Sequence, residues 1–199
     1  MTSEVVEIGE GIDRAYVDDA LRLSYEAFAR KFRIGFRNAD DLVRLFRGSV
    51  DTTSCLSATL NGRLLGILTF QAEGREFYRL KPTNVLTRFW PLRAALVVLN
   101  LVLLDDDAGP DGFVIDSLAV DPASRGMGIG TAMMLKAEEK AGLMGKRTMA
   151  LGVIGENAGA IRLYERLGYR ATRAWRGTLL RLFFGTREVR RMEKPLAAR

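Results

Sequence analysis

The spacing of hydrophobic and polar residues along the chain predicts a mixture of helices and strands. Stretches with apolar side chains every three to four positions have the period of an amphipathic helix, whereas short apolar runs bounded by turn residues are typical of strands. Helices are expected over 16–32, 42–46, 128–141 and 157–167. Strands are expected over 4–8, 54–60, 63–72, 113–120, 148–153, 169–175 and 187–193. This order predicts an α/β or α+β fold with helices on the faces of a mixed sheet.

Turn residues support these boundaries. Asn61-Gly62 separates two apolar runs by two residues, which favours a type I′ hairpin. Gly48 marks the end of the second expected helix, and Gly168 is expected as the C′ residue of the last one. No linker rich in Pro, Ser and Gly divides the chain, so we expect a single domain over 1–199.

An apolar insertion at 75–112 lies between the third and fourth expected strands. Neighbouring strands are usually joined by about 2–5 residues, so this connection is unusually long. Its densest part, 94–104, is too short for a transmembrane helix, which needs about 20 residues. Four roles remain open: an additional core helix, a homodimer interface through 84–104, a lid over a substrate pocket, or a helix on a membrane surface.

Composition excludes several classes of site. The chain has no histidine, which rules out Ser-His-Asp and Cys-His nucleophilic centres and His-based zinc sites, and we expect no metal site. The single cysteine, Cys55, cannot form an internal disulfide and is expected to pack in the core. Together with the absence of a secretory signal pattern and of a transmembrane segment, this predicts a cytoplasmic protein.

The net charge is +6 at pH 7. A positive charge can attract nucleic acid or a phosphorylated cofactor. The arginines are spread along the whole chain and are not grouped with a stacking motif, so nucleic acid is not the favoured partner.

The most informative stretch is 114–130. A short apolar strand ends at Asp121-Pro122, and Arg125 and three alternating glycines lead into a helix. This arrangement gathers free backbone N–H groups and the positive end of a helix dipole around one point, which suits a phosphate or pyrophosphate. Glycine permits the close approach and the positive φ that such a loop requires.

Two common phosphate-binding motifs do not fit this loop. A P-loop requires Gly-Lys-Ser/Thr at its end, whereas Thr131 follows Gly130 directly. A dinucleotide fingerprint requires a third glycine at position 131 or 133, where Thr131 and Met133 stand. The missing glycine argues against a dinucleotide-dependent oxidoreductase.

The run Arg125-Gly-Met-Gly-Ile-Gly130 resembles the Arg/Gln-x-x-Gly-x-Gly/Ala motif of the GNAT superfamily of N-acetyltransferases. The run Asn157-Ala-Gly-Ala-Ile-Arg-Leu-Tyr-Glu-Arg-Leu-Gly-Tyr169 resembles the second signature of that family. The resemblance covers about 116–175, whereas 75–112 departs from the usual pattern. It implies a mixed, mostly antiparallel twisted sheet flanked by helices, with the apolar segment as a helical insertion between the third and fourth strands.

The resemblance also implies a reaction. Acetyl-CoA would be the co-substrate, and its acetyl group would pass by direct attack to a primary amine of a small molecule or peptide. A non-catalytic module that binds CoA or acyl-CoA is the alternative within the same fold.

The resemblance assigns cofactor contacts to two segments. The pyrophosphate would be held by backbone N–H groups of Arg125, Gly126, Met127, Gly128, Ile129, Gly130 and Thr131. Backbone groups of Leu118, Ala119 and Val120 would pair with the pantetheine arm, as an added strand does, and an N–H near Leu118 or Ala119 would polarise the thioester oxygen. A bulge or splay in this strand is implied by the family, not by the sequence pattern.

Two side chains are candidates for proton transfer. Tyr164 is the candidate general acid, and it shares a helix face with Asn157, seven residues earlier. Both would approach the cofactor, although Tyr164 could instead pack on the sheet and Asn157 could serve as an N-cap.

Asp116 is the candidate general base. Strand alternation predicts that it shares a face with Val114, Leu118 and Val120, where apolar neighbours would raise the pKa of its carboxyl. A solvated or structurally paired aspartate is the alternative. Asp105–Asp107 and Asp111 form either an acidic rim for a cationic amine or a solvated loop.

Overall fold

A computed structural model describes residues 5–29, 36–78, 111–178 and 185–197. Its centre is a seven-stranded sheet with the order β1-β2-β3-β4-β5-β7-β6, in which only β4 and β5 are parallel neighbours. The strands are β1 Glu7–Glu10, β2 Cys55–Leu60, β3 Arg63–Gln71, β4 Gly112–Val120, β5 Thr148–Ile154, β6 Arg170–Arg176 and β7 Glu188–Pro195. The helices are α1 Val17–Ala27, α3 Ala39–Phe46, α6 Ile129–Leu143 and α7 Ala158–Arg166. The expected mixed, mostly antiparallel sheet with flanking helices is confirmed.

Element boundaries differ from the expected ones by a few residues. β1 begins at Glu7, and α3 begins at Ala39 because Asn38 accepts a hydrogen bond from Asp41 N–H as its N-cap. Both hairpin residues, Asn61 and Gly62, have positive φ (50° and 73°), as a type I′ turn requires. Of the apolar insertion, 79–110 lie outside the described residues, and so do the segment 84–104 and Asp105–Asp107. Its position between β3 and β4 is confirmed.

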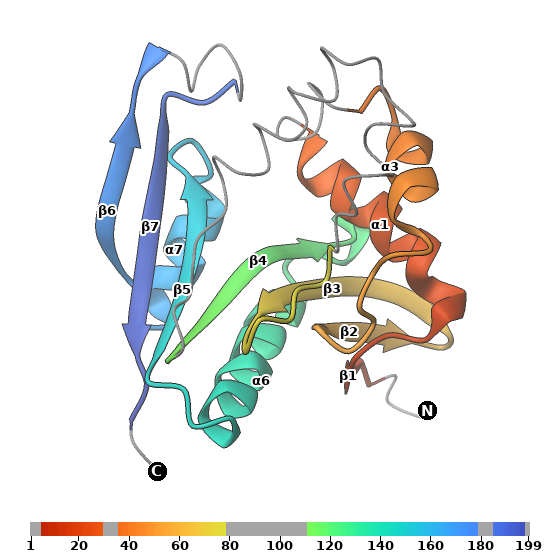
Figure 1. Ribbon diagram of the computed structural model, residues 1–199, viewed down its shortest axis with the longest axis horizontal. Helices are drawn as coiled ribbons and strands as arrows, with labels where there is room; N and C mark the ends of the chain where they lie inside the picture. Colours follow the sequence, from red (N-terminus) through yellow and green to blue (C-terminus); the bar gives the residue numbers. More distant parts are fainter. Residues whose placement is uncertain (1–4, 30–35, 79–110, 179–184, 198–199) are drawn as a thin grey trace.

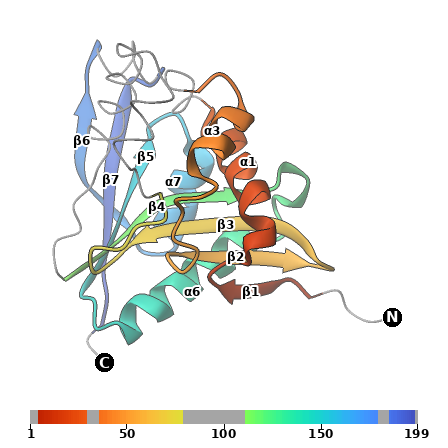
Figure 2. The same cartoon turned by 45° about the vertical axis from the view of Figure 1, so that its right-hand side comes forward.

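Helices cover both faces of the sheet (Figures 1 and 2). α1 and α3 pack on β2, β3 and β4 through a core that includes Leu21, Phe46 and Ile67. α6 and α7 pack on the opposite face through a second core that includes Met133 and Tyr164. Cys55 is fully buried in the first core, as expected. No helix of the described residues is both long enough and apolar enough to cross a membrane.

β4 and β5 separate halfway along their length. Their pairing runs from Gly112 opposite Thr148 to Ile115 opposite Leu151, and β4 then continues to Val120 beside β3 alone. β5 continues to Ile154 beside β7. Figure 1 shows the two strands diverging from their common start. The second half of β4 therefore has an edge that no described strand covers.

A β-bulge at Asp116 accompanies this divergence. Ser117 lies opposite Thr69 and Ile115 lies opposite Phe70, so Asp116 is the additional residue of β4. Side-chain alternation therefore changes phase at this point. Ile115 and Leu118, three residues apart, belong to the same core. The prediction that Asp116 shares a face with Val114, Leu118 and Val120 was wrong, because alternation assumes an uninterrupted strand.

Candidate active site

The glycine loop between β4 and α6 is open to solvent. Arg125 through Gly128 are exposed, and Gly126 and Gly128 have φ of 83° and 79°. A Cβ atom at either glycine would meet no atom within 4 Å. The space beside both glycines is therefore open, and glycine is needed here for its positive φ rather than for lack of room.

The first turn of α6 follows directly from this loop. Gly128 is its N-cap and supplies no side-chain hydrogen bond, and the first intrahelical bond runs from Ala132 N–H to Gly128 O (3.0 Å). The N–H groups of Ile129, Gly130 and Thr131 precede that bond, so the helix itself leaves them without partners. Such an uncapped N-terminus, next to an open glycine loop, favours an anionic group such as a diphosphate.

Two side chains fix the loop to the sheet. Asp121 accepts hydrogen bonds from Ala123 N–H (3.2 Å) and from the guanidinium of Arg63 (2.8 Å). The Arg125 side chain turns back and donates to Val120 O (3.3 Å). The first half of the loop is therefore held to the sheet, while Gly126, Met127 and Gly128 stay exposed.

The uncovered edge of β4 carries Leu118 and Val120. Asp121 N–H bonds Leu65 O on β3, and in an antiparallel ladder only every second residue points its backbone groups at the partner strand. Ala119 therefore faces β3, and Leu118 and Val120 direct their N–H and C=O groups toward the divergence from β5. Of the two residues expected to polarise a thioester oxygen, the register favours Leu118.

Gly130 marks where the three expected parts of the site meet. A Cβ built on it would lie 3.7 Å from Leu118 Cδ2 on β4 and 3.7 Å from Leu163 Cδ2 on α7. The glycine loop, the free half of β4 and the helix that carries the second sequence signature are thus brought together. Leu163 directly precedes Tyr164 in the chain.

The two α7 candidates differ in their surroundings. Asn157 is the N-cap, and its Oδ1 accepts from Ala160 N–H (3.1 Å), so capping is confirmed and its amide nitrogen remains for a ligand. Tyr164 is buried and packs near Tyr169, with ring centroids 6.1 Å apart. Burial raises the pKa of Tyr164 to about 12, which keeps its hydroxyl protonated at neutral pH.

Polar groups that the pattern analysis did not single out lie beside the bulge. The Thr69 and Ser117 hydroxyls are 2.7 Å apart and buried on the face of the sheet that α1 covers. The signal in the sequence was present, because Thr69 and Ser117 each interrupt an apolar strand at a position that faces a core.

The amino-acid sequence matches the acetyltransferase (GNAT) family model over residues 21–169 of its 199. The match includes the glycine loop, β4, β5 and α7, which are the elements that the geometry brings together. The chain belongs to the GNAT family. Its fold and family are therefore those of an acyltransferase enzyme.

Relatives of this GNAT chain match it over part of its length. An uncharacterized N-acetyltransferase of Methanocaldococcus jannaschii is 46% identical over 65 residues, which are 33% of this chain and 29% of that protein. The L-methionine sulfoximine/L-methionine sulfone acetyltransferase of Salmonella typhimurium is 37% identical over 79 residues, 38% of this chain and 46% of that protein. The matches span less than half of the length of either relative.

Structural similarity covers more of the chain than these sequence matches do. The crystal structure of a Bacillus subtilis acetyltransferase in complex with CoA has a TM-score of 0.58 and 17% identity, covering 98% of this chain and 100% of that one. At this identity the likeness concerns the fold alone.

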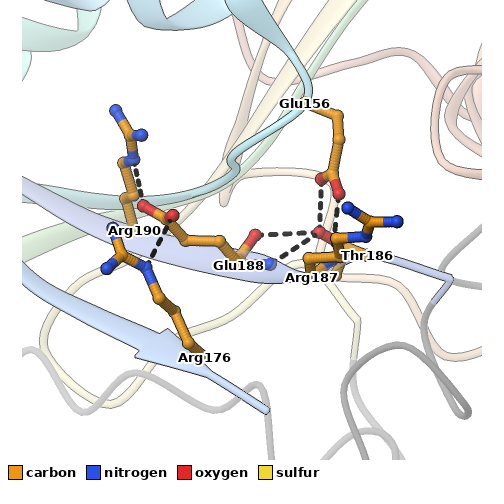
Figure 3. A network of polar contacts seen from close by, with 6 residues as sticks. All are labelled: Glu156, Arg176, Thr186, Arg187, Glu188 and Arg190. Carbon is orange, nitrogen blue, oxygen red and sulfur yellow. Dashed lines mark hydrogen bonds and ion pairs between the residues drawn. The ribbon is translucent and has the colours of Figure 1, made fainter. Parts of the chain in front are cut away.

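A polar network ties the start of α7 in this GNAT domain to β7 (Figure 3). Glu156 accepts hydrogen bonds from the Thr186 hydroxyl (2.5 Å) and Arg187 N–H (2.9 Å). Glu188 lies between Arg176 and Arg190, whose hydrogen bonds lower the pKa of its carboxyl. The network fixes the turn between β5 and α7, and so the position of Asn157. Glu156 and Thr186 are 30 positions apart in the sequence, and no motif indicated their contact.

No three His, Cys, Asp or Glu side chains within the described ranges are grouped so that they could hold a metal ion.

Proposed function

We propose that this chain transfers an acetyl group from acetyl-CoA to a primary amine. The observation that carries the proposal is the open glycine loop with positive φ at Gly126 and Gly128, which leads into the uncapped N-terminus of α6. The loop suits a diphosphate because no atom lies within 4 Å of a Cβ built at Gly126 or Gly128, and the α6 N–H groups that follow have no partner within the helix. Bound acetyl-CoA supplies the activated thioester.

Each segment of the site has a part in binding. Backbone N–H groups between Arg125 and Thr131 would hold the diphosphate. The N–H and C=O of Leu118 and the N–H of Val120 would hydrogen-bond the amide groups of the pantetheine arm along the free edge of β4, as an added strand does, whereas Val120 O already accepts from Arg125. The divergence of β4 from β5 supports this, because it leaves the ladder positions of Leu118 and Val120 uncovered. Asn157 would contact the cofactor through its remaining amide group.

The chemistry follows from the thioester and the amine. The amine nitrogen forms a bond to the acetyl carbon while the carbon–sulfur bond breaks; the nitrogen loses one proton and the sulfur receives one. Leu118 N–H is the candidate donor to the thioester oxygen. Tyr164 is the candidate general acid because it stands in the second family signature, on the helix whose Leu163 lies beside Gly130. Asp116 at the bulge is the candidate base.

The acceptor is proposed only as a primary amine. The Salmonella relative acts on amino-acid analogues that carry such a group. This similarity supports testing amino acids and their analogues first.

Release of free CoA thiol on mixing the full chain with acetyl-CoA and a panel of amines tests the proposal. The panel should hold L-methionine sulfoximine, polyamines and short peptides with free N-termini, with mass spectrometry of the products. Thiol release that depends on the amine, with an acetylated product, is the expected result. Saturable CoA binding without turnover on any amine would leave a binding module and contradict the proposal.

A further inference from the structure

Gly66 in β3 lies where α6 begins to cross the sheet. The register pairs Gly66 with Ala58 on β2 and with Val120 on β4, so it is an interior residue of a central strand. A glycine in such a place weakens the strand, and it commonly marks a bulge or the close approach of another element. Both features are present at Gly66.

A bulge in β3 directs two consecutive residues toward α6. Ala58 lies opposite Gly66 and the next residue of β2 lies opposite Leu64, so Leu65 is the additional residue of β3. Leu64 belongs to the core beneath α1, whereas Leu65 belongs to the core beneath α6. Gly66 faces α6 as well, because it is two residues from Leu68, which packs in the same α6 core.

The packing around Gly66 leaves little room for a side chain. A Cβ built on this residue would lie 3.1 Å from Met133 Sδ, 3.3 Å from Ala119 O and 3.4 Å from Ile129 Cγ2. All three distances are short for contacts of a Cβ atom. The absence of a side chain at Gly66 therefore lets the start of α6 lie close to β3 and β4.

Ile129 is the neighbour that connects Gly66 to the cofactor site. It is the first residue of α6, its side chain is buried, and its N–H is one of those that the helix leaves without a partner. Met133 can turn its flexible side chain aside, whereas Ala119 is held in the ladder opposite Ile67. The Ile129 side chain is β-branched and stiff at χ1, so displacing its Cγ2 displaces the first turn of the helix. A side chain at position 66 would therefore move the first N–H groups of α6 away from β4.

The same stretch of β3 also holds the glycine loop. Asp121 N–H bonds the carbonyl of the bulge residue Leu65 (2.8 Å), and the Asp121 carboxylate accepts from Arg63. The loop thus begins on Leu65, and the helix that follows it rests on Gly66. Two neighbouring residues of β3 therefore place both ends of the segment between β4 and α6.

We infer that Gly66 is a positioning residue for the cofactor site and acts through Ile129. By letting α6 start close to the sheet, Gly66 sets the distance between two parts of that site. One part is the group of α6 N–H donors for the diphosphate, and the other is the uncovered edge of β4 for the pantetheine arm. The inference rests on the proposed function, because it concerns how acetyl-CoA is held. Gly66 itself touches no ligand and takes no part in bond formation.

Dissociation constants of Gly66→Ala in the full chain test this role. CoA is titrated by isothermal calorimetry, and pantetheine, which has the arm but no diphosphate, is measured by its competition with CoA. We expect the dissociation constant for CoA to rise roughly threefold to tenfold, because displacing the first turn of α6 weakens the equivalent of one hydrogen bond to the diphosphate. The dissociation constant for pantetheine should stay as in the wild type, because this ligand uses only the edge of β4.

Gly9→Ala is the matched control. Gly9 is also a strand glycine, and a Cβ there would lie 3.6 Å from Ser57 Oγ, an ordinary contact, so both dissociation constants should be unchanged. Ile129→Ala provides a second background, because it removes the side chain that must move. In that background Gly66→Ala should no longer change the affinity for CoA, and this comparison carries the test if Gly66→Ala alone folds poorly.

Three results would overturn the inference alone. An unchanged dissociation constant for CoA in Gly66→Ala would make Gly66 a packing residue. An equal loss of affinity for CoA and pantetheine would indicate a general distortion of the domain. An undiminished effect of Gly66→Ala in the Ile129→Ala background would show that Ile129 does not transmit it. A wild-type chain that binds CoA but acetylates no amine would instead reject the proposed acetyl transfer and leave the role of Gly66 standing.

Discussion

Ser117 and Thr69 bond each other at 2.7 Å across β4 and β3, one residue beyond the bulge at Asp116. This pair marks the point at which β4 leaves β5 and its outer edge becomes available. The bulge also turns Leu118 into the α6 core while Ser117 faces α1. One additional residue in β4 therefore places Ile115 and Leu118, three residues apart, on the same face of the sheet.

Gly128→Ala should weaken acetyl-CoA binding. The φ of Gly128 is 79°, a region that costs a residue with a Cβ about 1–2 kcal/mol, so the loop should shift and affinity should fall roughly tenfold. Gly142→Ala is the control, since Gly142 lies within α6 without a positive φ and a Cβ there meets no atom within 4 Å. It should stabilise the helix by roughly 0.5–1 kcal/mol without changing affinity. Isothermal titration calorimetry measures the affinity for acetyl-CoA, and thermal unfolding measures the stability of each variant. An equal loss of affinity in the two variants would exclude a special role for the loop.

Tyr164→Phe should lower kcat while leaving affinity for acetyl-CoA unchanged. Loss of a general acid typically lowers the rate by about 10²-fold or more, and the ring that packs in the core is retained. The rate of CoA thiol release at saturating substrate gives kcat, and isothermal titration calorimetry gives the dissociation constant for acetyl-CoA. A parallel loss of both quantities would assign Tyr164 to binding, and an unchanged kcat would leave it as a packing residue.

Asn157→Ala and Asn157→Asp should separate capping from cofactor contact. Asn157→Ala removes the acceptor for Ala160 N–H and should lower the free energy of unfolding by about 1 kcal/mol. Asn157→Asp keeps a capping oxygen but loses the amide donor, so stability should be preserved while acetyl-CoA affinity falls. Denaturant unfolding and calorimetry distinguish the two effects. Unchanged affinity in Asn157→Asp would restrict this residue to capping.

The pH dependence of stability should report the burial of Tyr164. The pKa of its hydroxyl rises from an ordinary value of 10 to about 12, so the unfolded chain releases this proton first as the pH increases. The associated stability is complete below pH 10 and is lost between pH 10 and about 12, with a slope of at most about 1.4 kcal/mol per pH unit. Denaturant unfolding at a series of alkaline pH values should therefore give a shallower decline for Tyr164→Phe than for the wild type. Identical declines would show that Tyr164 titrates normally.

The local sequence pattern was sufficient to predict most of the helices, strands and turns of this protein. The helical period, the Asn61-Gly62 turn and the glycine loop after Val120 each depend on residues close together in the chain, so the sequence by itself determined the order of elements and the location of the open loop. The N-cap at Asn157 belongs to the same class, because its acceptor and donor are three residues apart. These features follow from backbone sterics and short-range hydrogen bonds, which neighbouring residues decide.

Tertiary structure decided the features that depend on register. The bulge at Asp116 reverses the alternation that the pattern predicts, and it exists only through the pairing of β4 with β3. The same pairing aligns Cys55, Thr69 and Ser117, and the contact of Glu156 with Thr186 joins residues 30 positions apart. A one-residue shift between strands moves every later side chain to the opposite face, and strand pairing over long separations sets that shift. The residues of the site are therefore recognisable in the sequence, whereas the faces they occupy are fixed only by the folded sheet.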